Sequence, residues 1–151
     1  WRSDPGSSLS NFGVDEHNAH TQRGGLYHYH SDPGALYNPT DVSRVSPVIG
    51  FAADGFPMYG PFAKIGGDIR SVTSSYRIKS GSRPSESGSP GGSYNGKYID
   101  DYEYVSGNGD LDECNGMTVD GQYGYYLSSG YPYLIGCFRG TPHSSFAKGG
   151  P

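Results

Sequence analysis

The sequence predicts a mainly β protein, a single compact domain of short strands joined by long loops rich in glycine, proline and serine. The 151 residues include 25 glycines and 11 prolines and are only 33% hydrophobic, which favours turns and short strands. No stretch repeats its apolar residues with the 3.6-residue period of a long helix. The 14 tyrosines form strands readily and can bury their rings, so we expect them to supply much of the core.

The elements follow in chain order. Residues 1–14 are a polar lead-in, and 15–30 form a histidine-rich hairpin that turns at Arg23-Gly24-Gly25. A turn at 31–34 precedes a buried strand within 46–53, which runs through Asp54-Gly55 into an extended segment at 56–62. Residues 76–79 alternate weakly, as a half-exposed strand does.

The second half of the chain opens with a low-complexity stretch, 80–97, which we expect to be a long exposed loop. Aromatic alternation returns at 98–105, followed by a turn at 107–110. Two last strands are expected near 123–127 and 133–138, and the tail 141–151 is polar. One domain therefore spans 1–151.

Charge and chain ends limit the function classes. A net charge of −4 provides no basic footprint for nucleic acid, and no apolar run is long enough to span a membrane. Because the sequence begins at Trp1 without a signal peptide, we expect a processed or excised piece, although a trimmed chain would look the same.

Four of the five histidines lie within the predicted hairpin. A His-x-His pair on a strand directs both imidazoles to one face, and the turn can bring the other two histidines back toward it. The alternative is a polar strand whose histidines only form hydrogen bonds. We favour a metal site, and its candidate ligands are His17, His20, His28 and His30.

A degenerate internal repeat separates these histidines from their scaffold. DEHNAHT at 15–21 matches DECNGMT at 112–118, and after one gap YHYH at 27–30 falls on YGYY at 123–126. The Asp, Glu, Asn, Thr and two Tyr positions persist in both copies, whereas the histidines occur only in the first. We therefore expect one turn-plus-strand unit built twice, with chance similarity as the alternative.

Several motifs resemble the YHYH-domain family: YHYH at 27–30, PVIGFAADGFPMYG at 47–60, GDLDECNG at 109–116 and YPYLIGCFRG at 131–140. The resemblance runs from Asp15 to Gly140. It implies a secreted or surface protein of marine microbes or algae, with no settled biochemical activity to carry over. The chain departs from the family pattern at the second YHYH, which reads YGYY here, and at His17, where members often have Cys.

Imidazole ligands suit copper, zinc, nickel or iron, and Cu(II) binds most strongly among the divalent ions, so copper is preferred and zinc is the second choice. His143 is a distant fifth candidate, and Asp15 or Glu16 can orient the rings. A weaker calcium hypothesis rests on Asp110 and Asp112, with a solvated acidic turn as its alternative. Cys114 and Cys137 are expected to form one disulfide, or to remain a free buried pair if the protein is cytosolic.

These features predict an extracellular metal-binding structural or interaction module, a building block of a surface or filamentous assembly whose partners are copies of itself or other surface proteins. One alternative is a copper- or zinc-dependent enzyme using the same histidines, but no catalytic motif is present. Another is a glycan-binding module in which tyrosine faces stack on sugars. The competing interpretation of these tyrosines is ordinary core packing of their rings.

Overall fold

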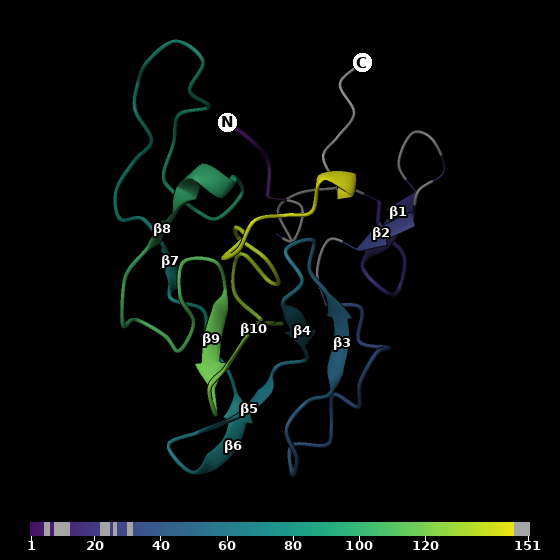
Figure 1. Cartoon of the computed structure of the whole chain (residues 1–151). Coiled ribbons are helices and arrows are strands. Elements are labelled where there is room, and N and C mark those ends of the chain that lie inside the picture. The colour runs from purple at the N-terminus through teal and green to yellow at the C-terminus, as the bar shows by residue number, and fades with distance from the viewer. Residues whose placement is uncertain (5–6, 8–12, 22–24, 26, 30–31, 147–151) are drawn as a thin grey trace.

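The computed structural model describes residues 1–4, 7, 13–21, 25, 27–29 and 32–146, and for 27–29 the backbone only. Short strands follow one another along the chain, as shown in Figure 1. They are β1 (Ala19–Thr21), β2 (Tyr27–Tyr29), β3 (Val48–Phe51), β4 (Pro57–Tyr59), β5 (Phe62–Ile65), β6 (Asp68–Ser71), β7 (Tyr76–Ile78), β8 (Tyr102–Tyr104), β9 (Gly116–Val119) and β10 (Gln122–Tyr126). Two short 3₁₀ helices are η1 (Ile99–Asp101) and η2 (Ser144–Phe146). The predicted β class is confirmed.

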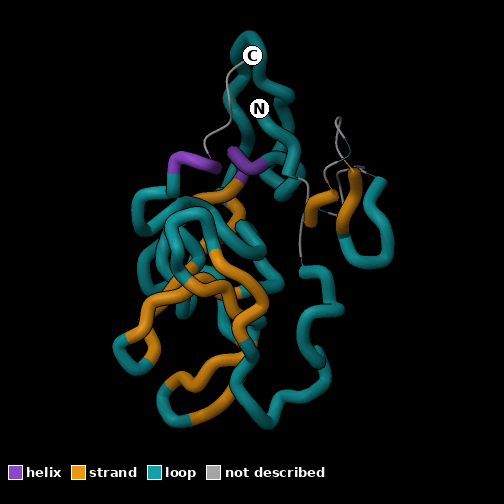
Figure 2. Tube along the Cα trace, turned by 45° about the vertical axis from the view of Figure 1, so that its right-hand side comes forward, coloured by secondary structure: helices purple, strands orange, loops and turns teal. Residues whose placement is uncertain are grey.

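The main sheet has four strands in the order β3-β4-β10-β9, and β4 and β10 run parallel while the other pairs are antiparallel. The remaining strands form three two-stranded ribbons, β1–β2, β5–β6 and β7–β8. Figure 2 shows that loops connect these short strands over most of the chain. The β1–β2 ribbon lies to one side of the body that holds the main sheet (Figures 1 and 2).

Turn residues explain the hairpins of the main sheet. Gly55 has φ 84°, and the Ala52 N–H donates to Phe56 O at 2.9 Å, which closes the predicted Asp54-Gly55 turn between β3 and β4. Asp120 and Gly121 have φ 49° and 82° between β9 and β10. Positive φ at both positions is what a two-residue type I′ turn requires, and Asp-Gly accommodates it.

The core lies on both faces of the main sheet. Consecutive residues of a strand point to opposite faces, and in β10 Tyr125 and Tyr126 enter different buried clusters. The first cluster contains Ala63, Val72, Leu111 and Tyr126; the second contains Ala52, Cys114 and Tyr125. Tyrosine rings thus occupy places that aliphatic side chains fill in most domains, as the composition predicts.

Residues 80–97 form no regular element apart from an isolated bridge between Ser82 and Ser93. Most of this segment is exposed, but Arg83 is buried beneath it. Its guanidinium donates to both oxygens of Asp101 at 2.8 and 2.7 Å, to Gly91 O at 2.7 Å and to Asn95 Oδ1 at 2.6 Å. One buried cation therefore holds the loop to η1.

The strand predicted near 133–138 is wrong. Residues 131–138 form turns, in which the Tyr133 N–H donates to Gly130 O and the Leu134 N–H to Pro132 O. Pro132 has no N–H to offer a neighbouring strand, and Tyr133 has φ 69°, outside the β region. Apolar content alone therefore misidentified a packed loop as a strand.

Candidate functional site

The β1–β2 and β9–β10 hairpins share one pairing register. In the first, Ala19 pairs with Tyr29, His20 with His28 and Thr21 with Tyr27. In the second, the residues that the sequence repeat makes equivalent pair in the same way: Gly116 with Tyr125, Met117 with Gly124 and Thr118 with Tyr123. The two copies therefore share one register at these three pairs of positions.

The turn that leads into each hairpin is also the same. The Asp15 carboxylate accepts the N–H groups of His17 and Ala19 at 2.8 and 3.2 Å. Asp112 accepts those of the equivalent residues, Cys114 and Gly116, at 3.0 and 2.8 Å. In both turns the Asn that follows the His or Cys has a positive φ, 57° at Asn18 and 66° at Asn115. The shared Asp and Asn of the repeat thus build the turn.

The face of the hairpin that carries His20 is covered in the second copy. There Met117 packs against the first buried cluster together with Tyr59 of β4, and a Cβ at Gly124 would come within 2.4 Å of the Tyr59 ring. In the first copy, the equivalent cross-strand positions hold His20 and His28. Directly opposite residues of an antiparallel pair share a face, so these positions form a cross-strand histidine pair.

His17 occupies the place of Cys114. In the second copy, the Cys114–Cys137 disulfide ties the turn to the chain that follows β10, which confirms the predicted disulfide. In the first copy, His17 Nδ1 lies 3.1 Å from Pro33 O, and Asn18 Nδ2 donates to Asp32 O at 2.8 Å. These bonds connect the turn to the chain after β2, and His17 is half-buried there.

The other predicted ligands lie apart from this pair or outside the described structure. His30 lies outside the described residues. His143 is exposed next to η2, where its Nδ1 contacts Ser145 Oγ at 2.8 Å. Across the residues whose side chains are described, no three His, Cys, Asp or Glu side chains gather as metal ligands. The transition-metal site stays a prediction.

The two calcium candidates are engaged with protein donors. Asp110 accepts two hydrogen bonds from the Arg70 guanidinium, at 2.8 and 2.6 Å, and two more from the N–H and hydroxyl of Thr73. The Arg70 bond, helped by Thr73 and opposed by burial, lowers the pKa of Asp110 to about 2. Asp112 caps its turn and accepts the Tyr123 hydroxyl at 3.0 Å. Calcium binding by Asp110 and Asp112 stays a prediction.

Replacing Asp112 by Ala should destabilise the protein more than replacing Asp15 by Ala. Asp112→Ala leaves two backbone N–H groups and the half-buried Tyr123 hydroxyl without their acceptor, at a cost of about 2 kcal/mol. Asp15 is exposed, so water can replace it at its two N–H groups and the loss is smaller. Urea unfolding of both variants measures the difference. Equal losses would show that the two turns contribute alike despite their different burial.

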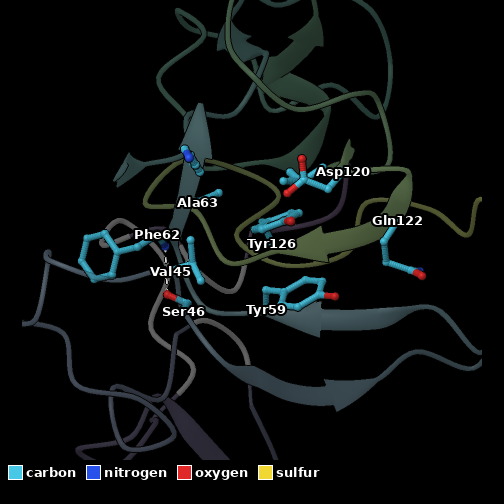
Figure 3. A pocket seen from close by; sticks show the side chains of 10 residues that line it. Val45, Ser46, Tyr59, Phe62, Ala63, Asp120, Gln122 and Tyr126 are labelled. Atoms are coloured by element: carbon cyan, nitrogen blue, oxygen red, sulfur yellow. Dashed lines mark hydrogen bonds between the residues drawn. The ribbon is translucent and has the colours of Figure 1, made fainter. Parts of the chain in front are cut away.

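The structure also forms a cavity that no sequence motif marked. Its volume is about 220 Å³, and its floor includes Tyr59 and Tyr126, which stack at 5.0 Å (Figure 3). Lys64, Asp120 and Gln122 also line it and are exposed. These residues come from β4, β5, the β9–β10 turn and β10, so no local spacing could have grouped them.

Comparison with known proteins identifies one family. A family model described as YHYH protein matches residues 1–140 of the chain. No curated protein and no solved structure matches the chain. No helix among the described residues has both the length and the apolar character needed to cross a bilayer.

Proposed function

The chain belongs to the YHYH family, and on that premise we propose that it is an extracellular metal-binding structural module with one transition-metal site on the β1–β2 hairpin. The ligands are drawn from His17, His20, His28 and His30. Copper is the preferred ion and zinc the second choice, because imidazole donors suit both and Cu(II) binds most strongly.

The pairing of His20 with His28 carries this proposal. The two copies of the hairpin share their turn and register, yet only the first has imidazoles at the central cross-strand position. In the second copy Met117 and Gly124 occupy that position and fit beneath Tyr59. Histidines are therefore not needed to build this hairpin, which supports a separate role for them.

His17 contributes in a different manner. A carbonyl oxygen can only accept, so the contact between His17 Nδ1 and Pro33 O requires the proton on Nδ1. Nε2 is then the basic nitrogen, the arrangement that carbonyl groups impose on many metal-bound histidines. His30 is assigned from the His-x-His spacing in the sequence alone.

Two features support an extracellular module that associates with other copies or surface proteins. Disulfides such as Cys114–Cys137 persist mainly in oxidising compartments. β3 is an edge strand of the main sheet, and its Val48 and Phe51 are 45% and 71% exposed. Exposed apolar edge strands favour pairing with another chain.

Titration calorimetry with Cu(II) and with Zn(II) tests the metal site. We expect the wild-type protein to bind at least one of them, and His20→Ala and His28→Ala to weaken binding by about tenfold or more, because each removes one of few ligands. At a hundredfold excess over Kd, the bound ion should raise the free energy of unfolding by about 2.7 kcal/mol. His143→Ala is the matched control and should bind like the wild type.

Failure of both ions to bind the wild-type protein, or an equal loss in His143→Ala, would contradict the site. Sedimentation velocity with and without the ion tests the assembly part of the proposal. A chain that stays monomeric at every concentration in both conditions is not an assembly module.

A further inference from the structure

Beyond the histidine hairpin, three cavities meet around Phe62. They have volumes of about 220, 420 and 400 Å³, and Phe62 lines all three. Tyr37 lines the second and third, whereas Val45 and Ser46 line the first and third. Because they share lining residues, the three cavities are neighbours around Phe62, and we call this group of cavities the Phe62 trough.

The segment 32–47 builds one wall of the trough and is anchored to the start of β5. The Ser46 N–H donates to Phe62 O at 2.8 Å, and the Phe62 N–H donates to Ser46 Oγ at 2.9 Å (Figure 3). The Tyr37 ring meets Phe62 edge-on at 6.4 Å, and its hydroxyl donates to Asp32. Gly60 permits this approach, since a Cβ there would lie 2.7 Å from Ser46 Oγ. The wall is therefore held in place at its middle, with cavities on either side.

The end of the trough in Figure 3 combines an aromatic floor with a polar rim. Tyr59 and Tyr126 lie in the floor, where Tyr126 is buried and Tyr59 is half-buried. In the described part of the chain, the side chains of Lys64 and Asp120 make no hydrogen bond or ion pair. Gln122 donates to Tyr123 O, and its side-chain oxygen is left to accept.

The charges along the trough select among ligands. Lys64 and Asp120 balance each other at one end, while Arg44 and Asp41, in the third cavity, form an ion pair at 2.7 Å. At the other end, Asp32 adds a carboxylate. Phosphate and other polyanions need an excess of cationic donors, which this lining does not supply.

A ligand for this lining must both donate and accept, because Lys64 only donates, whereas the Asp120 carboxylate and the remaining Gln122 side-chain oxygen only accept. Sugar hydroxyls do both, and the C–H faces of a sugar ring pack on an aromatic side chain such as Tyr59, which is half-buried. Three neighbouring cavities suit several linked rings rather than one. We propose that the Phe62 trough binds a neutral glycan chain, independently of the histidine hairpin.

Titration calorimetry with three neutral hexasaccharides tests this: a β-1,4-glucan, a β-1,3-glucan and a β-1,4-mannan. We expect at least one to bind, and Asp120→Gly and Gln122→Ala each to weaken it by about tenfold, the effect of one lost hydrogen bond. Glycine suits the positive φ of residue 120, so Asp120→Gly keeps the turn. Asp68→Ala removes an exposed carboxylate outside the trough lining and is the matched control, and His20→Ala should bind the glycan like the wild type.

Three results would overturn the proposal. One is no binding of any of the three hexasaccharides. Another is binding that Asp120→Gly and Gln122→Ala leave unchanged. The third is tighter binding of a hexagalacturonate or of a decaproline peptide, which would assign the trough to a polyanion or to an extended peptide. Thermal melts of each variant establish that a lost signal is not lost folding.

Discussion

Asp101→Asn should lower the free energy of unfolding by about 3–5 kcal/mol at neutral pH, the cost of breaking a buried ion pair from one side. Asp101 is fully buried and Arg83 nearly so, with side-chain exposures of 0% and 6%. The carboxylate also accepts the N–H groups of Asn95, Gly96 and Tyr98. An amide at this position leaves the Arg83 guanidinium without its counter-charge beneath the 80–97 loop.

The pH dependence identifies the ion pair as the cause. Burial acts to raise the pKa of Asp101, but hydrogen bonds from Arg83 and from backbone N–H groups outweigh it and lower the pKa to about 2. A carboxyl whose pKa is depressed in the folded protein stabilises the fold at pH values above about 3.9, its pKa in the unfolded chain. That contribution is lost as the pH falls toward 2. The difference in free energy of unfolding between the wild type and Asp101→Asn should therefore become smaller below about pH 4.

Urea unfolding at pH 7 and pH 2.5 provides both measurements. The matched control is Asp100→Asn, because Asp100 is the exposed neighbour whose carboxylate accepts one N–H, from Arg2. It should stay within about 0.5 kcal/mol of the wild type. If the free energy of unfolding lost in Asp101→Asn were the same at both pH values, packing rather than charge would account for it.

Removing the disulfide should cost about 3 kcal/mol, because Cys114 and Cys137 are 23 residues apart and the cross-link restricts the unfolded chain by about that amount. In a domain of this size, the loss corresponds to a melting temperature lower by roughly 6–12 °C. The variant is Cys114→Ser with Cys137→Ser, compared by calorimetry with the oxidised wild type.

Reducing the disulfide of the wild-type protein is the control for the double serine variant. Reduced wild type should melt close to the double serine variant, and the variant should not respond to reductant. The first hairpin offers a built-in comparison, because His17 and Pro33 join its turn to the following chain without a covalent bond. A double variant as stable as the oxidised wild type would mean that the remaining contacts of the Asp112 turn suffice.

The sequence predicted the features that depend on near neighbours. Glycine and proline content indicated short strands and many turns, and the Asp54-Gly55 turn lies where its dipeptide predicts. The repeat of 15–21 in 112–118 predicted two equivalent hairpins, and their turns and registers agree. These features are predictable because one Asp side chain and a few backbone groups, all within five residues, form the turn.

The features that the sequence did not predict, a loop at 133–138 and a buried arginine within 80–97, also have a physical cause. The segment 133–138 carries strand-like residues, but Pro132 and the positive φ of Tyr133 make it a loop, and the disulfide attaches it to the second turn. The low-complexity composition of 80–97 indicated an exposed loop and concealed Arg83, whose partner Asp101 lies 18 residues away. Neither contact leaves a periodic trace in the sequence.

The sequence by itself determined the β class, the repeated hairpin and the presence of histidines in only one copy. Tertiary structure decided which surfaces those hairpins acquire. The second copy pairs with β4 and lies beneath Tyr59, whereas in the first the equivalent positions pair His20 with His28. Tertiary structure also assembled the Phe62 trough from segments that lie far apart in the chain. Pairing across a hairpin is a local property, but burial and cavities depend on residues that meet only after the chain has folded.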